Sequence, residues 1–384
     1  AFHYSIDWAT QFRTAHWWMI FFLPLAGLAI VASYRVTKMQ DDRGTEFVIG
    51  AVREGRVLRF RTAPLIFLGT VLTHLTGGSA GREGAALQLG GCLSGSLGRV
   101  LRLDDKDERI ITMCGMAGGF SALFGTPLAA AVFAMEVESI GVMYYAALVP
   151  CVLSALIANV ISSLFGVAST SFTLAAIPEL SAISLLQTIG LGIVFGALAS
   201  LFCRAMHTGG TLYKKIENPY LRIVVGGCIV VLLSLLVRSG NYNGAGMSVI
   251  SAALAGHAVP WAFALKIVFT VLTLGAGFKG GEIVPCFFVG ATCGCVVAPL
   301  LGMDAGFGAA LGLIAVFCGV TNSPMTSILL GYELFGGQGL ALLAMCAAVS
   351  YLLSGYSGLY REQKIIYSKT SPVFIGRKGG EEKQ

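Results

Sequence analysis

The sequence predicts an all-α integral membrane protein, and three observations support this prediction. Of the 384 residues, 55% are hydrophobic and only 12% are charged, whereas a soluble domain carries about 25% charged residues. Several apolar stretches approach or exceed the roughly 20 residues that a helix needs to cross the hydrocarbon core of a bilayer. Other apolar stretches are short or interrupted by Gly, Pro or Glu. Broken segments occur at membrane depth only where they are buried in protein or line a cavity, so they are a first indication of a transport site.

The clearest candidate spans are residues 17–36, 110–135, 142–164, 185–202, 223–237 and 340–353. Three stretches are too short or too interrupted to be predicted as simple spans, namely residues 65–76, 284–301 and 325–330. We expect one transmembrane domain over residues 1–384, without a soluble regulatory domain. The polar C-terminal tail, residues 367–384, is expected to be disordered beyond Phe374. The stretch that begins at Trp17 lacks a small-residue cleavage site, so we expect no cleavable signal peptide.

The formal net charge of +6 does not predict nucleic-acid binding. Basic residues gather in predicted loops, as at 53–61 and 214–215, and such flanking charge is typical of segments that fix membrane orientation. The ten cysteines lie mostly in apolar stretches and are interpreted as small core residues. Cys293 and Cys295 are too close together for a zinc site, and we expect no metal and no cofactor. The run from Gly77 to Gly84 lacks the Gly-Lys-Ser/Thr of a nucleotide-binding loop.

The two halves of the chain, about 10–170 and 185–353, contain matching motifs. Each half has a Gly-rich turn with a glutamate, then a Pro-containing motif, then a second glutamate. These segments are 81–84, 125–130 and Glu136 in the first half, and 280–283, 322–327 and Glu333 in the second. The spacing from proline to the second glutamate is the same in both halves. Matched order and spacing predict an internal repeat, and duplicated halves are common in transporters.

The Gly-rich turns favour an anionic substrate. Inverted repeats place broken helices at the bilayer midplane, with helix N-termini that converge on the substrate. Glycine permits tight turns and close backbone approach, and the free N–H groups at a helix N-terminus attract an anion. Many of the 50 glycines are expected to serve helix packing instead.

Glu83 is the first candidate for a proton-linked gate. It lies between Gly81 and Gly84 and precedes an apolar run, and an ionisable residue at membrane depth indicates a functional site. A carboxylate at a helix N-terminus mimics the bound anion, leaves when it is protonated and returns when the anion departs. The alternative is a surface glutamate paired with Arg82.

Glu282 lies in a similar context, beside Gly280 and Gly281 and before Pro285, which suits the first turn of a helix. From the residues alone it is either structural or a second titrating group. Glu136 and Glu333 follow their prolines on otherwise apolar segments, where they face loops or cap neighbouring helices. Tyr356 and Tyr360 are interfacial aromatics by default.

Taken together, these motifs resemble those of the CLC family of anion channels and anion/proton antiporters. Residues 78–84 (Gly-Ser-Ala-Gly-Arg-Glu-Gly) resemble its Gly-Arg-Glu-Gly signature, and residues 122–136 and 321–333 resemble its two Pro-containing motifs. The likeness extends from about residue 17 to residue 360. It implies a CLC-type inverted repeat of tilted and broken helices, a multi-pass protein of the cell membrane in contact with lipid, and a homodimer. It also implies that Glu83 is the gating glutamate on the external side. The anion-binding residues that it implies are Gly44, Thr45, Gly81, Arg82, Gly84, Ile283, Val284 and Tyr360.

Three departures from the chloride-transporting pattern refine this interpretation. Glu282 stands where chloride transporters carry a different residue before Phe-x-Pro, and Gly-Gly-Glu before a proline resembles the fluoride/proton antiporter branch. Val137 stands at the internal proton glutamate of chloride/proton exchangers, an acid that the fluoride branch also lacks. The loop from Arg43 to Phe47 lacks the Met and Asn of the fluoride branch, and its Thr45 hydroxyl is a candidate anion donor.

The leading hypothesis is therefore proton-coupled halide transport, namely fluoride export by fluoride/proton antiport, with Glu83 and Glu282 as the gating and proton-coupling residues. The halide anion and protons are its expected partners. The alternative is a chloride-transporting CLC exchanger or passive channel, which Thr45 and the absence of the fluoride branch's Met and Asn in the same loop favour. Within this alternative, Val137 favours uncoupled conduction. A remote alternative is an intramembrane hydrolase that uses Ser79 and His74, and we otherwise expect no enzymatic activity.

Overall fold

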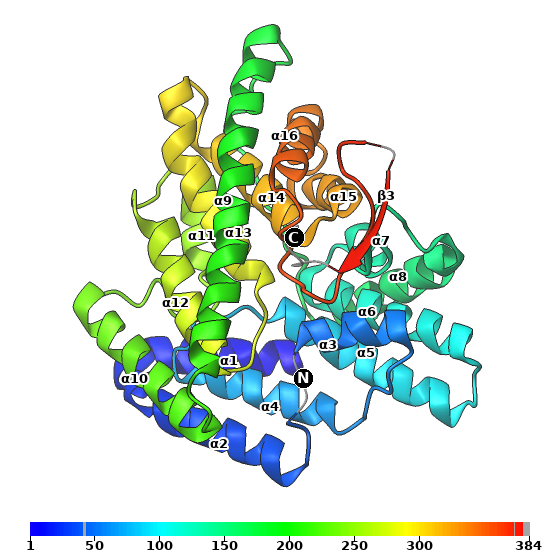
Figure 1. The fold of residues 1–384 in the computed structure, drawn as a ribbon. Helices are drawn as coiled ribbons and strands as arrows, with labels where there is room; N and C mark the ends of the chain where they lie inside the picture. Colours follow the sequence, from blue (N-terminus) through cyan, green and yellow to red (C-terminus); the bar gives the residue numbers. More distant parts are fainter. Residues whose placement is uncertain (41–43, 372, 379–384) are drawn as a thin grey trace.

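The structure is a computed structural model that describes residues 1–40, 44–371 and 373–378. Almost all secondary structure in these residues is helical (Figure 1). The first half contains α1 (Phe2–Ala15), η1 (Trp17–Phe22), α2 (Leu23–Val36), α3 (Thr45–Glu54), α4 (Thr62–Leu75), α5 (Glu83–Val100), α6 (Asp105–Phe124), α7 (Pro127–Glu136), η2 (Tyr145–Ala147) and α8 (Leu148–Leu164). The second half contains α9 (Ala182–Lys214), α10 (Pro219–Val237), α11 (Met247–Leu254), α12 (Ala262–Ala276), α13 (Ile283–Val297), η3 (Ala298–Leu301), α14 (Ala305–Thr321), α15 (Pro324–Phe335) and α16 (Leu340–Leu353).

The two halves repeat the same series of helices. Helices α4, α5 and α6 begin at residues 62, 83 and 105, and α12, α13 and α14 begin at residues 262, 283 and 305. In each half a short helix that starts with proline follows, α7 in the first and α15 in the second. The halves meet in an antiparallel bridge between Gly81 and Gly281. The antiparallel contact of equivalent residues fits the inverted relation that the sequence motifs predict.

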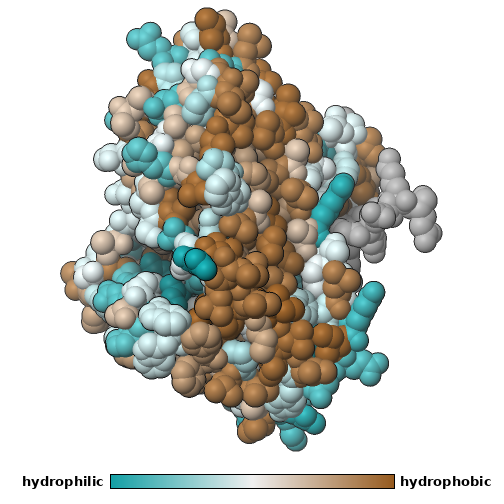
Figure 2. Space-filling view, turned by 90° about the vertical axis from the view of Figure 1, so that its left-hand side faces the viewer, coloured by the Kyte–Doolittle hydropathy of each residue, from teal (hydrophilic) through white to brown (hydrophobic). Residues whose placement is uncertain are grey.

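Five segments of the described chain are long and apolar enough to cross a membrane: Trp17–Val36, Tyr145–Leu164, Ala182–Lys214, Pro219–Val237 and Ile283–Leu301. Four of them contain or nearly coincide with predicted spans. Figure 2 shows a broad hydrophobic area on the side of the molecule that carries α10 and α12, with hydrophilic residues near its borders. Long apolar helices and a hydrophobic outer surface are the properties of a protein that is embedded in lipid.

Two predictions about spans were wrong, and the predicted span 340–353 is the 14-residue helix α16, which is too short to be among the five candidate spans. The stretch 110–135 is broken, because Gly125 ends α6 with a left-handed φ of 76° and Pro127 begins α7. Proline has no N–H for a continuing helix. Conversely, the stretch 284–301, which we expected to be too short or too interrupted, belongs to the candidate span Ile283–Leu301, in which α13 passes directly into η3. Pro285 lies in its first turn, where the missing N–H leaves no helical bond unmade.

The C-terminal segment also differs from the expectation of disorder beyond Phe374. Strands β1 (Ser139–Ile140), β2 (Lys364–Tyr367) and β3 (Phe374–Lys378) form a small sheet in that order. β1 pairs parallel with β2, and β2 pairs antiparallel with β3. Strand β3 runs back along β2, and the pairing satisfies backbone hydrogen-bonding groups of both strands. Residues 379–384 lie outside the described residues.

The core of the second half is packed through glycine. Nearly every residue of α13 and α14 is buried. A Cβ on Gly290 would lie 2.1 Å from the carbonyl oxygen of Gly312, and a Cβ on Gly312 would lie 2.1 Å from that of Gly290. Only glycine permits such a close approach of two backbones. Membrane helices often pack through small residues in this way, because the hydrophobic effect contributes little to helix association inside a bilayer. This packing fixes α13 beside the site described next.

Candidate functional site

The two Gly-rich turns lie in contact, each at the start of a helix. The Gly81 N–H donates to the Gly281 carbonyl at 2.7 Å, and the Gly281 N–H donates to the Gly81 carbonyl at 2.8 Å. Helix α5 begins two residues after Gly81, and α13 begins two residues after Gly281. The prediction that these turns begin two helices at one place is therefore confirmed. Because the first N–H groups of a helix lack intrahelical acceptors, two sets of donors meet here.

Glu83 is the first residue of α5 and is 2% exposed. Its Oε2 accepts a hydrogen bond from the Arg82 N–H at 2.9 Å. The Arg82 guanidinium reaches Glu83 Oε1 at 3.7 Å and makes its closer contact, 2.7 Å, with Asp7 of α1. The pairing with Arg82 is present, yet the carboxylate is buried and not at the surface. It occupies the N-terminal end of a helix, which is where an anion binds.

Glu282 and Thr45 meet at Gly84, close to Glu83 along α5. A Cβ on Gly84 would lie 2.7 Å from Thr45 Oγ1 and 3.5 Å from Glu282 Oε2. Glu282 Oε2 is buried and has no hydrogen-bond partner among the described residues. A buried polar atom is normally hydrogen-bonded, so this oxygen is available to interact with a group that enters the site. The structure thus places both predicted gating residues and the Thr45 hydroxyl around one point.

The other predicted anion-binding residues lie around this centre in different ways. Ile283 and Val284 form the first turn of α13 and are buried. Gly44 precedes α3 with a left-handed φ of 73°, which favours glycine. The Tyr360 hydroxyl is buried without a partner among the described residues, and Glu282 is one of the charged groups that act on it electrostatically. The Arg82 guanidinium points instead towards Asp7. Arg43, which the predicted loop includes, lies outside the described residues.

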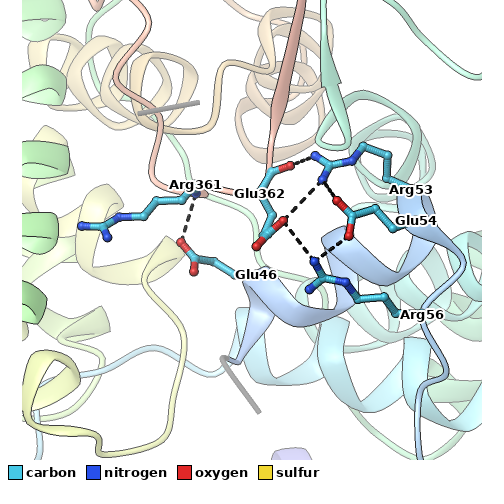
Figure 3. Close-up of polar contacts among 6 residues, drawn as sticks. All are labelled: Glu46, Arg53, Glu54, Arg56, Arg361 and Glu362. Atoms are coloured by element: carbon cyan, nitrogen blue, oxygen red, sulfur yellow. Dashed lines mark hydrogen bonds and ion pairs between the residues drawn. The ribbon is translucent and has the colours of Figure 1, made fainter. Parts of the chain in front are cut away.

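Sequence reasoning missed a third carboxylate, that of Glu46 in the first turn of α3. Its Oε1 accepts a hydrogen bond from the Arg361 N–H at 3.0 Å (Figure 3). The negative charge of Glu46 acts on both Glu282 and Tyr360. The position directly after Thr45 could have indicated it, since an acid in the first turn of a helix is stabilised by the helix dipole.

The chain that follows Tyr360 is held against α3. The Arg53 guanidinium contacts Glu54 and both the carbonyl and the carboxylate of Glu362, and Arg56 contacts the two glutamates (Figure 3). The hydrogen bond from Arg53 lowers the pKa of Glu54 to about 2, so this carboxylate remains charged at neutral pH. These contacts fix the position of Tyr360 relative to Thr45.

Glu136 and Glu333 cap helices, which confirms one of the two predicted roles. The Glu136 carboxylate, at the end of α7, accepts N–H bonds from Met325 and Thr326 of α15 at 3.0 and 2.8 Å. The Glu333 carboxylate accepts N–H bonds from Leu128 and Ala129 of α7, both at 2.9 Å. Each helix therefore supplies the acceptor for the other helix's N-terminus.

The hydrolase alternative gains no support from the geometry. In the described part of the chain, Ser79 Oγ is hydrogen-bonded to Thr270 Oγ1 at 3.1 Å. His74 uses Nδ1 to bond the Thr70 carbonyl at 2.9 Å, and its Nε2 has no partner. A nucleophile needs a base within hydrogen-bond reach, and Ser79 and His74 are not paired in this way.

The fold and the buried helix starts define a multi-pass integral membrane protein built from two inverted halves. Residues 25–355 match the voltage gated chloride channel family. The chain belongs to this family, the CLC family of channels and transporters, as its motifs predicted.

Individual relatives are consistent with this assignment. A protein of Pseudomonas syringae pv. tomato described as a chloride/fluoride channel protein is 39% identical over 373 residues, which cover 95% of this chain and 82% of the relative. An H(+)/Cl(-) exchange transporter ClcA of Klebsiella pneumoniae is 26% identical over 317 residues, which cover 77% of this chain and 67% of the relative.

Two solved structures have the same fold. The crystal structure of a CLC-type fluoride/proton antiporter superposes with a TM-score of 0.92 at 35% identity, covering 95% of this chain and 93% of that one. A slow cyanobacterial Cl-/H+ antiporter superposes with a TM-score of 0.77 at 19% identity, covering 92% and 88%. The second likeness concerns the fold alone.

Proposed function

We propose that the protein exchanges a halide for protons across the membrane and that its principal substrate is fluoride. The observation that carries this proposal is Glu282, a partly buried side chain whose buried Oε2 is unpartnered among the described residues and lies near the Thr45 hydroxyl. The likeness to a chloride/fluoride channel protein and to a fluoride/proton antiporter supports the choice of substrate.

In this proposal Glu83 is the gate. Its carboxylate lies over the start of α5, where it accepts the Arg82 N–H. Protonation removes the negative charge and weakens that hydrogen bond, so the side chain leaves and an anion takes its place at the helix N-terminus. When the anion departs, the side chain releases its proton and returns. One group thus competes with the anion and carries the proton.

Glu282 supplies selectivity in this proposal. A charged carboxylate would repel an anion by roughly 4 kcal/mol for unit charges at 4 Å and an effective dielectric constant near 20. Glu282 must therefore be protonated as the anion passes, be compensated by a donor, or turn away. A protonated carboxyl group donates a hydrogen bond. Fluoride is the smallest and most strongly hydrated halide, so it gains most when strong donors replace its water.

The test is transport by the purified protein. Liposomes loaded with fluoride or chloride are expected to show faster fluoride efflux, with proton uptake that stops when fluoride is absent. Chloride transport without fluoride flux would reject the selectivity. Fluoride flux without proton movement would reject the coupling.

A chloride-transporting CLC remains the second candidate because two observations favour it. Thr45 places a hydroxyl at the centre of the site, and its loop lacks the Met and Asn of the fluoride branch. Within this second candidate, the buried Val137, which stands in place of an internal proton acceptor, favours passive conduction over exchange. Passive chloride current in the same liposomes would select this candidate. Transport, and not catalysis, is the activity that either version of the proposal assigns.

The family likeness implies that two copies pair, and we include a homodimer in the proposal. The span Tyr145–Leu164 has the smallest buried share, 17%, of the five candidate spans, so its apolar side chains are available for lipid or a second copy. Chemical cross-linking in membranes is expected to give a dimer, and a product of monomer mass alone would reject it.

A further inference from the structure

The gate residue Glu83 is connected to one face of the molecule through Arg82. The Arg82 guanidinium contacts the partly exposed Asp7 of α1 at 2.7 Å. A proton that crosses the membrane also needs titratable groups towards the other face, since transporters pass protons along chains of such side chains. Val137 is buried and cannot titrate. A carboxylate that connects Glu282 with solvent at the other face would complete the route.

Helices α3 and α5 both run from the candidate site towards this other face. Thr45 is the first residue of α3, and Glu83 is the first residue of α5. Near the far end of α5, the Arg99 guanidinium donates to the carbonyl of Leu58, which lies just beyond α3. The two helices therefore end together, at the opposite end of α5 from Arg82. Side chains of α3 can link the site with this face.

Three carboxylates lie along α3 and the segment that follows Tyr360, and arginines engage two of them (Figure 3). Arg53 and Arg56 both form ion pairs with Glu54 and Glu362. Among the described residues, no Lys, Arg or His lies within ion-pair distance of the Glu46 carboxylate. An adjacent arginine holds a carboxylate in its charged form. Glu46, without such a partner, is the carboxylate of the three that is free to take up a proton.

Glu46 also lies between solvent and the candidate site. It is partly exposed, and it directly follows Thr45, whose hydroxyl meets Glu282 Oε2 at Gly84. The charge of Glu46 acts on Glu282 and on Tyr360. Glu282 Oε2 and the Tyr360 hydroxyl are both buried without a partner among the described residues, so both are available to accept a proton.

Two basic side chains near Glu46 are directed towards other groups. The Arg361 backbone N–H donates to Glu46 Oε1 at 3.0 Å, but its guanidinium donates to the His207 carbonyl of α9 at 3.3 Å (Figure 3). The His207 ring, on which the charge of Glu46 also acts, has Nε2 at 3.3 Å from the Leu359 carbonyl. The contact that Glu46 makes is therefore with a neutral amide, which does not hold its charge in place.

We propose that Glu46 is a proton relay between the solution at this face and Glu282, an inference that rests on the proposed function. A hydronium ion transfers its proton to a carboxylate oxygen of Glu46 and becomes water. The new O–H bond breaks when Glu282 takes up the proton, and Glu46 returns to its carboxylate form. While Glu46 carries the proton it is neutral, so it does not repel a halide near Thr45.

Glu46→Gln separates a relay from a purely structural role. The amide keeps an oxygen that can accept the Arg361 N–H, but it does not titrate. In fluoride-loaded liposomes, Glu46→Gln is expected to lose most of the proton-to-fluoride ratio while fluoride flux continues. Glu46→Asp, which titrates, is expected to retain the ratio. The matched comparison is Glu54→Gln on the same helix, which is expected to keep the ratio even where the loss of its ion pairs lowers the rate.

Equal proton-to-fluoride ratios in Glu46→Gln and Glu54→Gln would overturn the proposal. Melting temperatures show which variants are folded, and Glu46→His provides a second measurement if Glu46→Gln is not. A histidine in water releases its proton at a higher pH than a glutamate does. Glu46→His is therefore expected to shift the pH at which half of the coupling is lost upward. An unshifted pH profile in this variant would also overturn the proposal, because a structural role does not depend on the residue's own titration.

The same liposomes distinguish a failure of this inference from a failure of the proposed function. Coupled transport by the unchanged protein, together with an unaltered ratio in Glu46→Gln, rejects the relay and leaves the proposed function in place. Proton exchange for chloride in place of fluoride rejects the proposed substrate, and the proton-to-chloride ratio of Glu46→Gln then tests the relay in the same way. Halide flux without proton movement in the unchanged protein rejects both.

Discussion

At the scale of single residues, the buried Glu83 and the partly buried Glu282 lie at adjoining helix starts with different surroundings. Glu83 Oε2 accepts a backbone N–H at 2.9 Å, whereas Glu282 Oε2 has no partner among the described residues. The first carboxylate is held as an anion would be held. The second has a free oxygen at the place where a substrate would pass. The two glutamates are therefore suited to different tasks, one to compete with the anion and one to donate to it.

Replacing Glu83 by Gln is expected to abolish proton coupling. The amide neither titrates nor competes as an anion at the start of α5. Proton uptake by fluoride-loaded liposomes is the measurement, and anion flux is expected to fall or become passive. The exposed Glu217→Gln is the control, with unchanged coupling. If Glu83→Gln still moves protons uphill against an anion gradient, Glu83 is not the gate.

Replacing Glu282 by Ala is expected to lower fluoride transport at least as much as chloride transport, because the protonated carboxyl group is the proposed strong donor. The pH profile is expected to change as well. In the unchanged protein, flux through the site falls as pH rises and Glu282 loses its proton, since the charged form repels the anion. The alanine variant loses this part of the decline. Equal fluoride flux with an unchanged profile would show that Glu282 is a bystander.

At the scale of helices, α7 and α15 stabilise each other through Glu136 and Glu333. Glu136→Ala leaves the N–H groups of Met325 and Thr326 without their acceptors. Leaving buried donors unpaired costs about 1–3 kcal/mol, so the melting temperature of the purified protein is expected to fall. Glu136→Gln keeps one acceptor oxygen and is expected to fall less. If Glu136→Ala has the same melting temperature as the exposed control Glu217→Ala, the Glu136 cap contributes nothing to stability.

Local sequence patterns predicted where helices start better than they predicted which helices lie next to one another in space. The Gly-Arg-Glu-Gly turn placed Glu83 at the start of α5, because the signals of a helix start are local. The same local chemistry, a glycine in left-handed conformation followed by Pro127, breaks the stretch 110–135, yet continuous hydropathy hid the break. The contact of Asp7 with Arg82 joins α1 to α5 across the fold, and no local pattern indicates it.

At the scale of the whole molecule, the repeat predicted that the Gly-rich turns of the two halves would point helix starts at one site. The separation of the turns could not be read from the sequence, because it depends on how closely α5 and α13 pack. The structure brings them into mutual hydrogen bonds between Gly81 and Gly281. The small size of glycine sets this distance, and therefore sets how closely Thr45 approaches Glu282.

Gly281→Ala tests this meeting of the halves. Its Cβ would lie 2.6 Å from the Gly84 nitrogen and 3.0 Å from the Gly84 Cα. These are backbone atoms, which cannot relieve the overlap by a rotamer change, so the start of α5 must move away from α13. Overpacking of this kind costs about 1–3 kcal/mol of stability. We expect a lower melting temperature and the loss of most fluoride flux in liposomes, because Thr45 and Glu282 meet at Gly84.

Two further glycines calibrate this result. Gly210 lies within α9 and has no atom within 4 Å of an added Cβ, so Gly210→Ala is expected to leave flux unchanged. Gly81→Ala is expected to fall between the two. Its nearest neighbour is the end of the Glu83 side chain, at 3.0 Å, which can move at the expense of the gate, and the Gly281 carbonyl follows at 3.2 Å. If Gly281→Ala transports and melts as Gly210→Ala does, the halves do not touch at this pair, and the shared anion site at the two helix starts is wrong.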